Sequence, residues 1–171
     1  LLVGEEPVAD TDLERITIAF FSHDAWPERA GNFFGVALRA NNLAWLHSMS
    51  AGVDSPIFQM LKDLGVRLTN SSGSSSAPIA RTVMMYLLAL ARDLPRMMRA
   101  QANAEWAWDR WSELEGKRVA VIGYGPIGEE VVRLTTAFGM QPVIIRRQVQ
   151  GDETCPVRPL VELAAVMAEV D

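Results

Sequence analysis

Residues 118–147 read RVAVIGYGPIGEEVVRLTTAFGMQPVIIRR, and this stretch decides the fold. It opens with a short apolar run rich in valine and isoleucine, which is typical of a buried strand. Apolar residues at helical period follow, and they end at Gly139, where a glycine commonly terminates a helix. A second β-branched run, Val143–Ile145, comes next. The stretch therefore predicts a strand, a glycine turn, a helix and a second strand.

Three glycines in this stretch have the G-x-G-x-x-G spacing of a dinucleotide site: Gly123, Gly125 and Gly128. The first lets the chain turn out of the strand, the second lets the backbone approach a pyrophosphate, and the third lets helix and strand pack closely. Pro126 lacks an N–H but suits a first helical turn, so Ile127 and Gly128 must supply the donors. Because the flanking strand and helix are both present, we predict a dinucleotide site rather than an ordinary glycine-rich turn.

The end of the second strand carries arginine where an NAD site usually carries Asp or Glu. Arg146 and Arg147 lie about 20 residues beyond the last glycine of the motif, which is the usual place of that acid. A guanidinium group cannot accept a hydrogen bond from a ribose 2′-OH, but it binds phosphate through a fork of donors. The two arginines therefore favour NADP over NAD, with a solvated surface pair as the alternative.

The composition is that of an ordinary globular protein, because 49% of the 171 residues are hydrophobic and 22% are charged. The net charge of −5 argues against binding to nucleic acid. The single cysteine, Cys155, excludes a disulfide framework and a cysteine-based metal site. We expect a cytoplasmic protein without a signal peptide, and the apolar segment VMMYLLAL is too short to span a membrane.

The first 70 residues also read as alternating strands and helices. Apolar runs predict strands over residues 1–3, 16–21, 43–47 and 66–70, and weaker patterns predict helices over residues 27–40 and 56–64. The small-residue loop Ser48–Val53 precedes the second helix. A loop at the start of a helix suits an anion, because free N–H groups face it there.

A change in composition at SSGSSSAP, residues 71–78, predicts a loop and a hinge between domains. We place one domain at residues 1–75 and a second at residues 76–171. The helix that follows, over about residues 77–94, is apolar on all sides in its centre, which predicts burial between domains or subunits. Three tryptophans come after it, and we interpret them as packing or interface anchors: Trp106, Trp108 and Trp111.

Five motifs, taken in order, resemble the D-isomer-specific 2-hydroxyacid dehydrogenases, a family that includes glyoxylate/hydroxypyruvate reductases. They are SMSAGVD, GVRLTNSSG, APIARTVMMYLLALARDLPR, ELEGKRVAVIGYGPIG and AFGM, between about Asn42 and Asp171. The resemblance implies an α/β protein with a flavodoxin-like substrate domain and a Rossmann-type NAD(P)-binding domain. It implies hydride transfer between NADP(H) and a small 2-keto or 2-hydroxy acid, and a homodimer when complete. Because the sequence starts without Met and few strands of the nucleotide domain are legible, we expect a fragment open at both ends.

The resemblance also assigns residues. It implies that the substrate carboxylate binds backbone N–H groups of Ala51 and Gly52, with a turn that binds nothing as the alternative. The Arg, Glu and His that perform catalysis in the family match no residue here, so we expect no catalytic residue and an inactive fragment. Arg81 stands where many members have Glu. A non-catalytic NAD(P)-sensing protein of the corepressor type has the same fold and is the alternative function.

Overall fold

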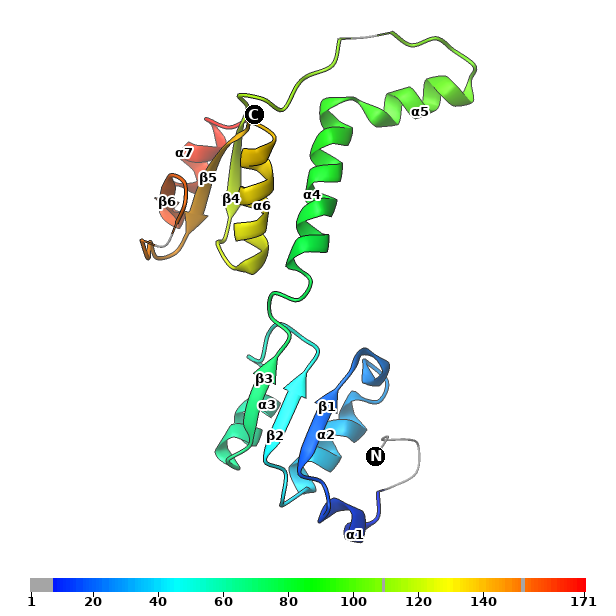
Figure 1. Ribbon diagram of the computed structural model, residues 1–171, viewed down its shortest axis with the longest axis vertical. Helices are drawn as coiled ribbons and strands as arrows, with labels where there is room; N and C mark the ends of the chain where they lie inside the picture. Colours follow the sequence, from blue (N-terminus) through cyan, green and yellow to red (C-terminus); the bar gives the residue numbers. More distant parts are fainter. Residues whose placement is uncertain (1–7, 109, 152) are drawn as a thin grey trace. The chain divides into compact units, whose positions relative to one another are not determined.

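A computed structural model describes residues 8–108, 110–151 and 153–171. The strand predicted over residues 1–3 lies outside this range. The chain divides into two compact units, Leu1–Ser72 and Gly73–Asp171, and each contains a parallel sheet (Figure 1). No helix within the described residues is long and apolar enough to cross a membrane.

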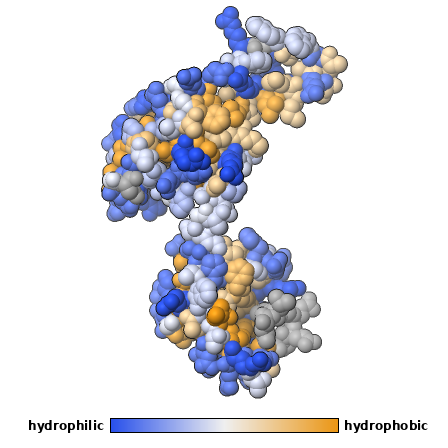
Figure 2. Space-filling view, in the orientation of Figure 1, coloured by the Kyte–Doolittle hydropathy of each residue, from blue (hydrophilic) through white to orange (hydrophobic). Residues whose placement is uncertain are grey.

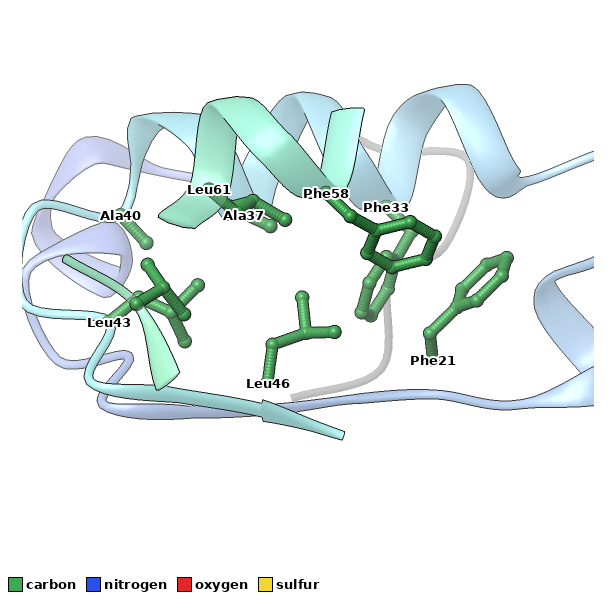
Figure 3. Close-up of a cluster of buried hydrophobic side chains, with 9 residues drawn as sticks. Phe21, Phe33, Ala37, Ala40, Leu43, Leu46, Phe58 and Leu61 are labelled. Atoms are coloured by element: carbon green, nitrogen blue, oxygen red, sulfur yellow. The ribbon is translucent and has the colours of Figure 1, made fainter. Parts of the chain in front are cut away.

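The first unit contains a three-stranded parallel sheet with the strand order β1-β2-β3. Its elements are α1 (Asp10–Leu13), β1 (Ile18–Phe21), η1 (His23–Ala25), α2 (Ala30–Arg39), β2 (Trp45–Ser48), α3 (Pro56–Asp63) and β3 (Arg67–Asn70). Side chains from α2, α3 and one face of the sheet form its core, with Phe21, Leu46 and Phe58 among them (Figure 3). Burial of this apolar surface is the main force that holds the helices on the sheet.

The opposite face of this sheet is exposed within the first unit. Successive strand residues point to opposite faces, so Phe21 enters the core while Phe20 lies on the outer face, where His47 stacks on it at 5.6 Å between ring centroids. Trp45 lies on the same face and is also exposed. The strand predicted over residues 16–21 is thus present as β1, but an apolar run does not report how many of its faces are covered.

The second unit contains another parallel sheet, with the strand order β4-β5-β6. Its elements are α4 (Ser76–Ala91), α5 (Leu94–Ala102), β4 (Arg118–Ile122), α6 (Pro126–Ala137), β5 (Gln141–Arg146), β6 (Val157–Pro159), η2 (Leu160–Glu162) and α7 (Leu163–Met167). Ile144 packs toward α6 and α4, whereas Val143 and Ile145 pack with Val166 of α7. The central strand is therefore buried on both faces, as expected for a parallel sheet.

Helix α4 is buried on one side only. Ala80 and Met84 face the core of the second unit, whereas Met85, Tyr86 and Leu90 are exposed. Figure 2 shows hydrophobic residues on the visible surface of this unit. Helix α4 thus packs on α6 with one side, while the other side is exposed among the described residues of the second unit. Its burial between domains or subunits stays a prediction. The three tryptophans predicted to be anchors are exposed as well.

Candidate functional site

The glycine loop joins the end of β4 to the start of α6. Gly123 has a φ of +91°, a conformation that glycine adopts without strain. Its N–H donates to the Ile145 carbonyl at 2.7 Å, which links the loop to the end of β5. Gly125 is the N-cap residue of α6, and Pro126 occupies the first helical turn as predicted. The sequence stretch thus forms the strand, turn and helix that a dinucleotide site needs.

Gly128 lies in a tightly packed place, whereas Gly125 lies beside open space. A Cβ on Gly128 would lie 2.3 Å from the Gly123 carbonyl oxygen, so close packing of α6 on the loop requires glycine there. A Cβ on Gly125 would meet no atom of the described residues within 4 Å. The space beside Gly125 is therefore open, and a ligand can approach the backbone at this point.

The N-terminus of α6 carries the donors of the loop. The Glu129 N–H donates to the Gly125 carbonyl at 2.9 Å, which starts the hydrogen bonding of α6. The N–H groups of Ile127 and Gly128 come earlier in the chain than this first donor. Among the residues that the structure describes, these two N–H groups have no acceptor. Free N–H groups and the positive end of the helix dipole both favour an anion. The loop therefore fits the pyrophosphate of a dinucleotide.

The end of β5 holds an ion pair that sequence reasoning missed. Arg146 Nη1 donates to Glu153 Oε1 at 2.8 Å, and only 14% of the arginine side chain and 3% of the glutamate side chain are exposed. The Gln150 and Gly151 N–H groups also donate to this carboxylate, at 3.0 and 2.7 Å. These backbone donors, Gln150 first, and the Arg146 guanidinium lower the pKa of Glu153 to about 2. Glu153 is therefore an ionised partner of Arg146, and backbone N–H groups fix its carboxylate in place.

The ion pair lies beside the glycine loop. The Arg146 guanidinium carbon is 5.8 Å from the centroid of the Tyr124 ring, and the Tyr124 hydroxyl lies 3.2 Å from Thr154 Oγ1. The loops that follow β4 and β5 are thus tied to each other. Arg147 is exposed and has no hydrogen bond or ion pair within the described part of the chain.

The small-residue loop of the first unit is held by its carbonyl groups. The Ser50 carbonyl accepts from Ser71 N–H at 3.3 Å, and the Ala51 carbonyl accepts from Asn70 Nδ2 at 2.8 Å. The C=O and N–H of one trans peptide group point in opposite directions. The N–H groups of Ala51 and Gly52 are therefore turned away from these partners, and neither has an acceptor within the described residues.

Further contacts fix this loop. Ser50 Oγ donates to the Gly52 carbonyl at 3.0 Å and lies 2.6 Å from the buried Ser48 hydroxyl. Loop Ser48–Val53 thus presents two N–H donors in a set orientation, which suits a carboxylate. The sequence predicted the loop, but not the role of Asn70, because that contact joins two strand ends.

The two histidines have no catalytic arrangement within the described residues. His47 Nδ1 lies 2.8 Å from Thr69 Oγ1, and His47 Nε2 lies 3.1 Å from Ser71 Oγ. Together with the Phe20 stacking, these contacts make His47 a part of the sheet surface. His23 lies exposed in η1. Arg81 is exposed in α4, and nothing in the structure explains its identity.

Residues 84–171 match the family model described as D-isomer specific 2-hydroxyacid dehydrogenase, NAD binding domain. The matched residues include the glycine loop and both arginines at the end of β5. The model therefore covers the helix α6 and the strands on both sides of it.

Named relatives and solved structures agree with this match. A D-3-phosphoglycerate dehydrogenase from Methanocaldococcus jannaschii is 34% identical over 60% of this chain and 20% of its own length. A hydroxypyruvate reductase from Thermotoga maritima is 30% identical over 76% of this chain and 42% of its own. The solved structure of a D-isomer specific 2-hydroxyacid dehydrogenase family protein from Aeromonas salmonicida has a TM-score of 0.68 at 26% identity, covering 95% of this chain and 50% of that one. The chain thus spans half or less of the length of these proteins.

Proposed function

Because the chain belongs to the D-isomer specific 2-hydroxyacid dehydrogenases, we propose that the complete protein transfers hydride between a nicotinamide cofactor and a small 2-keto or 2-hydroxy acid. The observation that carries this proposal is the glycine loop, which within the described residues has open space at Gly125 and N–H groups without an acceptor at Ile127 and Gly128. When bound, the cofactor supplies the hydride. The residues of this chain bind and orient it.

In this proposal the N–H groups of Ile127 and Gly128 bind the pyrophosphate, and Gly123 and Gly125 let the backbone approach it. Pro126 fixes the first turn of α6 without contributing a donor. The N–H groups of Ala51 and Gly52 bind the carboxylate of the substrate. Their fixed orientation supports this role, because a preorganised donor loses little freedom when the anion binds.

We also propose that NADP(H) is preferred over NAD(H). Arg147 supports this preference as an exposed cation at the end of β5, where a 2′-phosphate would gain charge-assisted hydrogen bonds. Arg146 supports it only in part, because Glu153 already accepts from this guanidinium.

Two further parts of the proposal concern the complete protein. The family's Arg, Glu and His match no residue here, so the 171 residues alone should bind nucleotide without turnover. The exposed apolar side of α4, with Met85, Tyr86 and Leu90, supports a homodimer. The proposed location of the complete protein is the cytoplasm.

The test is calorimetric titration of the chain with NADP⁺ and NAD⁺. Gly125→Val places a side chain in the space through which the pyrophosphate approaches, so binding should weaken at least about tenfold, or about 1.4 kcal/mol. Gly31→Val is the matched control, because Gly31 is exposed in α2, a Cβ there also meets no atom within 4 Å, and it lies in the other unit. Equal binding by Gly125→Val and wild type would contradict the proposal.

A further inference from the structure

We propose that Glu153 sets the cofactor preference by acting as a built-in counterion of Arg146, so that it limits selection for a 2′-phosphate. This inference rests on the proposed function, because it requires an adenine nucleotide in the loop between β4 and α6. Glu153 lies in the loop after β5, beyond both the glycine motif and the arginines at the strand end.

The first observation is the way in which the carboxylate is held. Oε1 accepts from Arg146 Nη1 and from Gln150 N–H, and Oε2 accepts from Gly151 N–H, at 2.8, 3.0 and 2.7 Å. The loop after β5 thus forms an anion site with three donors on one carboxylate, and the chain fills that site with its own side chain. Only 3% of the Glu153 side chain is exposed, so its carboxylate is held by these donors and not by solvent.

The second observation is the position of the pair. Gly123 N–H bonds to the Ile145 carbonyl, so Arg146 follows directly on the residue that touches the glycine loop. Its guanidinium lies over the ring of Tyr124, between the first two glycines of the motif. In dinucleotide-binding folds, the end of the second strand is where the ribose 2′ position is recognised.

The consequence follows from charge. Glu153 offsets the charge of Arg146, whereas Arg147 has no ion pair within the described part of the chain. A 2′-phosphate carries a charge of about −1.5 to −2, and the Glu153 carboxylate opposes its approach to Arg146 because like charges repel and because the carboxylate already accepts from this guanidinium. A ribose 2′-OH is not repelled, and a carboxylate can accept its hydrogen bond. Glu153 therefore narrows the preference for NADP(H).

The experiment compares 2′,5′-ADP with 5′-AMP, since these probes differ only in the 2′-phosphate. Dissociation constants are measured by calorimetry for the wild type and for Glu153→Gln, which keeps the shape of the side chain and removes its charge. The ratio of the 5′-AMP constant to the 2′,5′-ADP constant should rise about tenfold in Glu153→Gln, mainly through tighter binding of 2′,5′-ADP.

Glu169→Gln is the matched control, because it removes one charge from an ion pair with Arg118 at the opposite end of β4. Its ratio should equal that of the wild type. Glu153→Asp is the second variant, since its shorter side chain holds Arg146 less well, and it should raise the ratio by a smaller factor. An unchanged ratio in both Glu153 variants, with both probes bound, overturns this inference and leaves the proposed function intact. Failure of both probes to bind the wild type overturns the proposed function itself.

Discussion

At the scale of single residues, Asn70 shows how a side chain sets the direction of a backbone donor. Its amide holds the Ala51 carbonyl at 2.8 Å, and the Gly52 N–H therefore points the opposite way. Removal of this donor frees the peptide group to rotate. The orientation of the carboxylate loop thus depends on a residue nineteen positions away along the chain.

We expect Asn70→Leu to weaken binding of glyoxylate by the complete protein about tenfold, because the Gly52 donor loses its fixed direction. Asn42→Leu is the control, since Asn42 also donates from Nδ2 to a backbone carbonyl, that of Glu14, at 2.6 Å. Binding is measured by calorimetry. A tenfold loss in both variants would show a general effect on stability and contradict the role of Asn70.

Glu153 gives a prediction on pH. Hydrogen bonds from Gln150, Gly151 and Arg146 lower its pKa from the ordinary 4.5 to about 2. A group with a lowered pKa stabilises the folded state above its unfolded pKa, and this contribution disappears as the pH falls to the folded value. The wild type should therefore lose stability relative to Glu153→Gln between pH 4.5 and 2.

The measurement is urea unfolding of both proteins, followed by NMR peaks of β5, at several pH values. The other carboxylates titrate in both proteins and cancel in the difference. A difference in the free energy of unfolding that stays constant down to pH 2 would contradict the bonding pattern of Glu153.

The residues of the glycine loop could be predicted because their roles depend on spacing within one short stretch. Glu153 could not be predicted in the same way. The segment from Arg147 to Gly151 has no periodic pattern, so its path back to Arg146 depends on tertiary contacts such as that between Tyr124 and Thr154. The sequence signal was two adjacent acidic residues, at positions 152 and 153, a few positions beyond the strand-end arginines.

At the scale of elements, the sequence predicted the strand, helix and strand of residues 118–147, and β4, α6 and β5 confirm them. Strand β6 was missed, because three residues that include a proline give no alternating pattern. The predicted helix over residues 27–40 begins only at Ala30. The apolar patterns of β1 and α4 did not predict which of their faces are exposed in this chain, since a hydrophobic pattern does not show which partner covers a surface. Burial of α4 between domains or subunits stays a prediction.

The contact of α6 with the glycine loop gives a prediction at this scale. Gly128→Ala should lower the melting temperature of the second unit, because the new Cβ would lie 2.3 Å from the Gly123 carbonyl oxygen and must push the helix away. Overpacking of this kind costs about 1–3 kcal/mol. Gly125→Ala should leave the melting temperature nearly unchanged, since a Cβ there meets nothing within 4 Å. Equal melting temperatures for Gly128→Ala and the wild type would contradict the packing.

At the scale of the whole molecule, the chain consists of two α/β units, each with its own sheet and core. The fold class and the family predicted from ordered motifs are confirmed by the match over residues 84–171 and by the solved relatives. Substrate, cofactor preference and assembly stay predictions, because they depend on single contacts and on the complete protein rather than on the fold.

The most direct test of the central claim is an amide NMR titration of the ¹⁵N-labelled chain with NADP⁺. The account predicts that the N–H signals of Gly125, Ile127 and Gly128 shift most, with Arg147 next, because these groups lie along the path from pyrophosphate to ribose. Signals of α2, in the other unit, should stay in place. Saturable binding that leaves the amides of Ile127 and Gly128 unchanged would contradict the account.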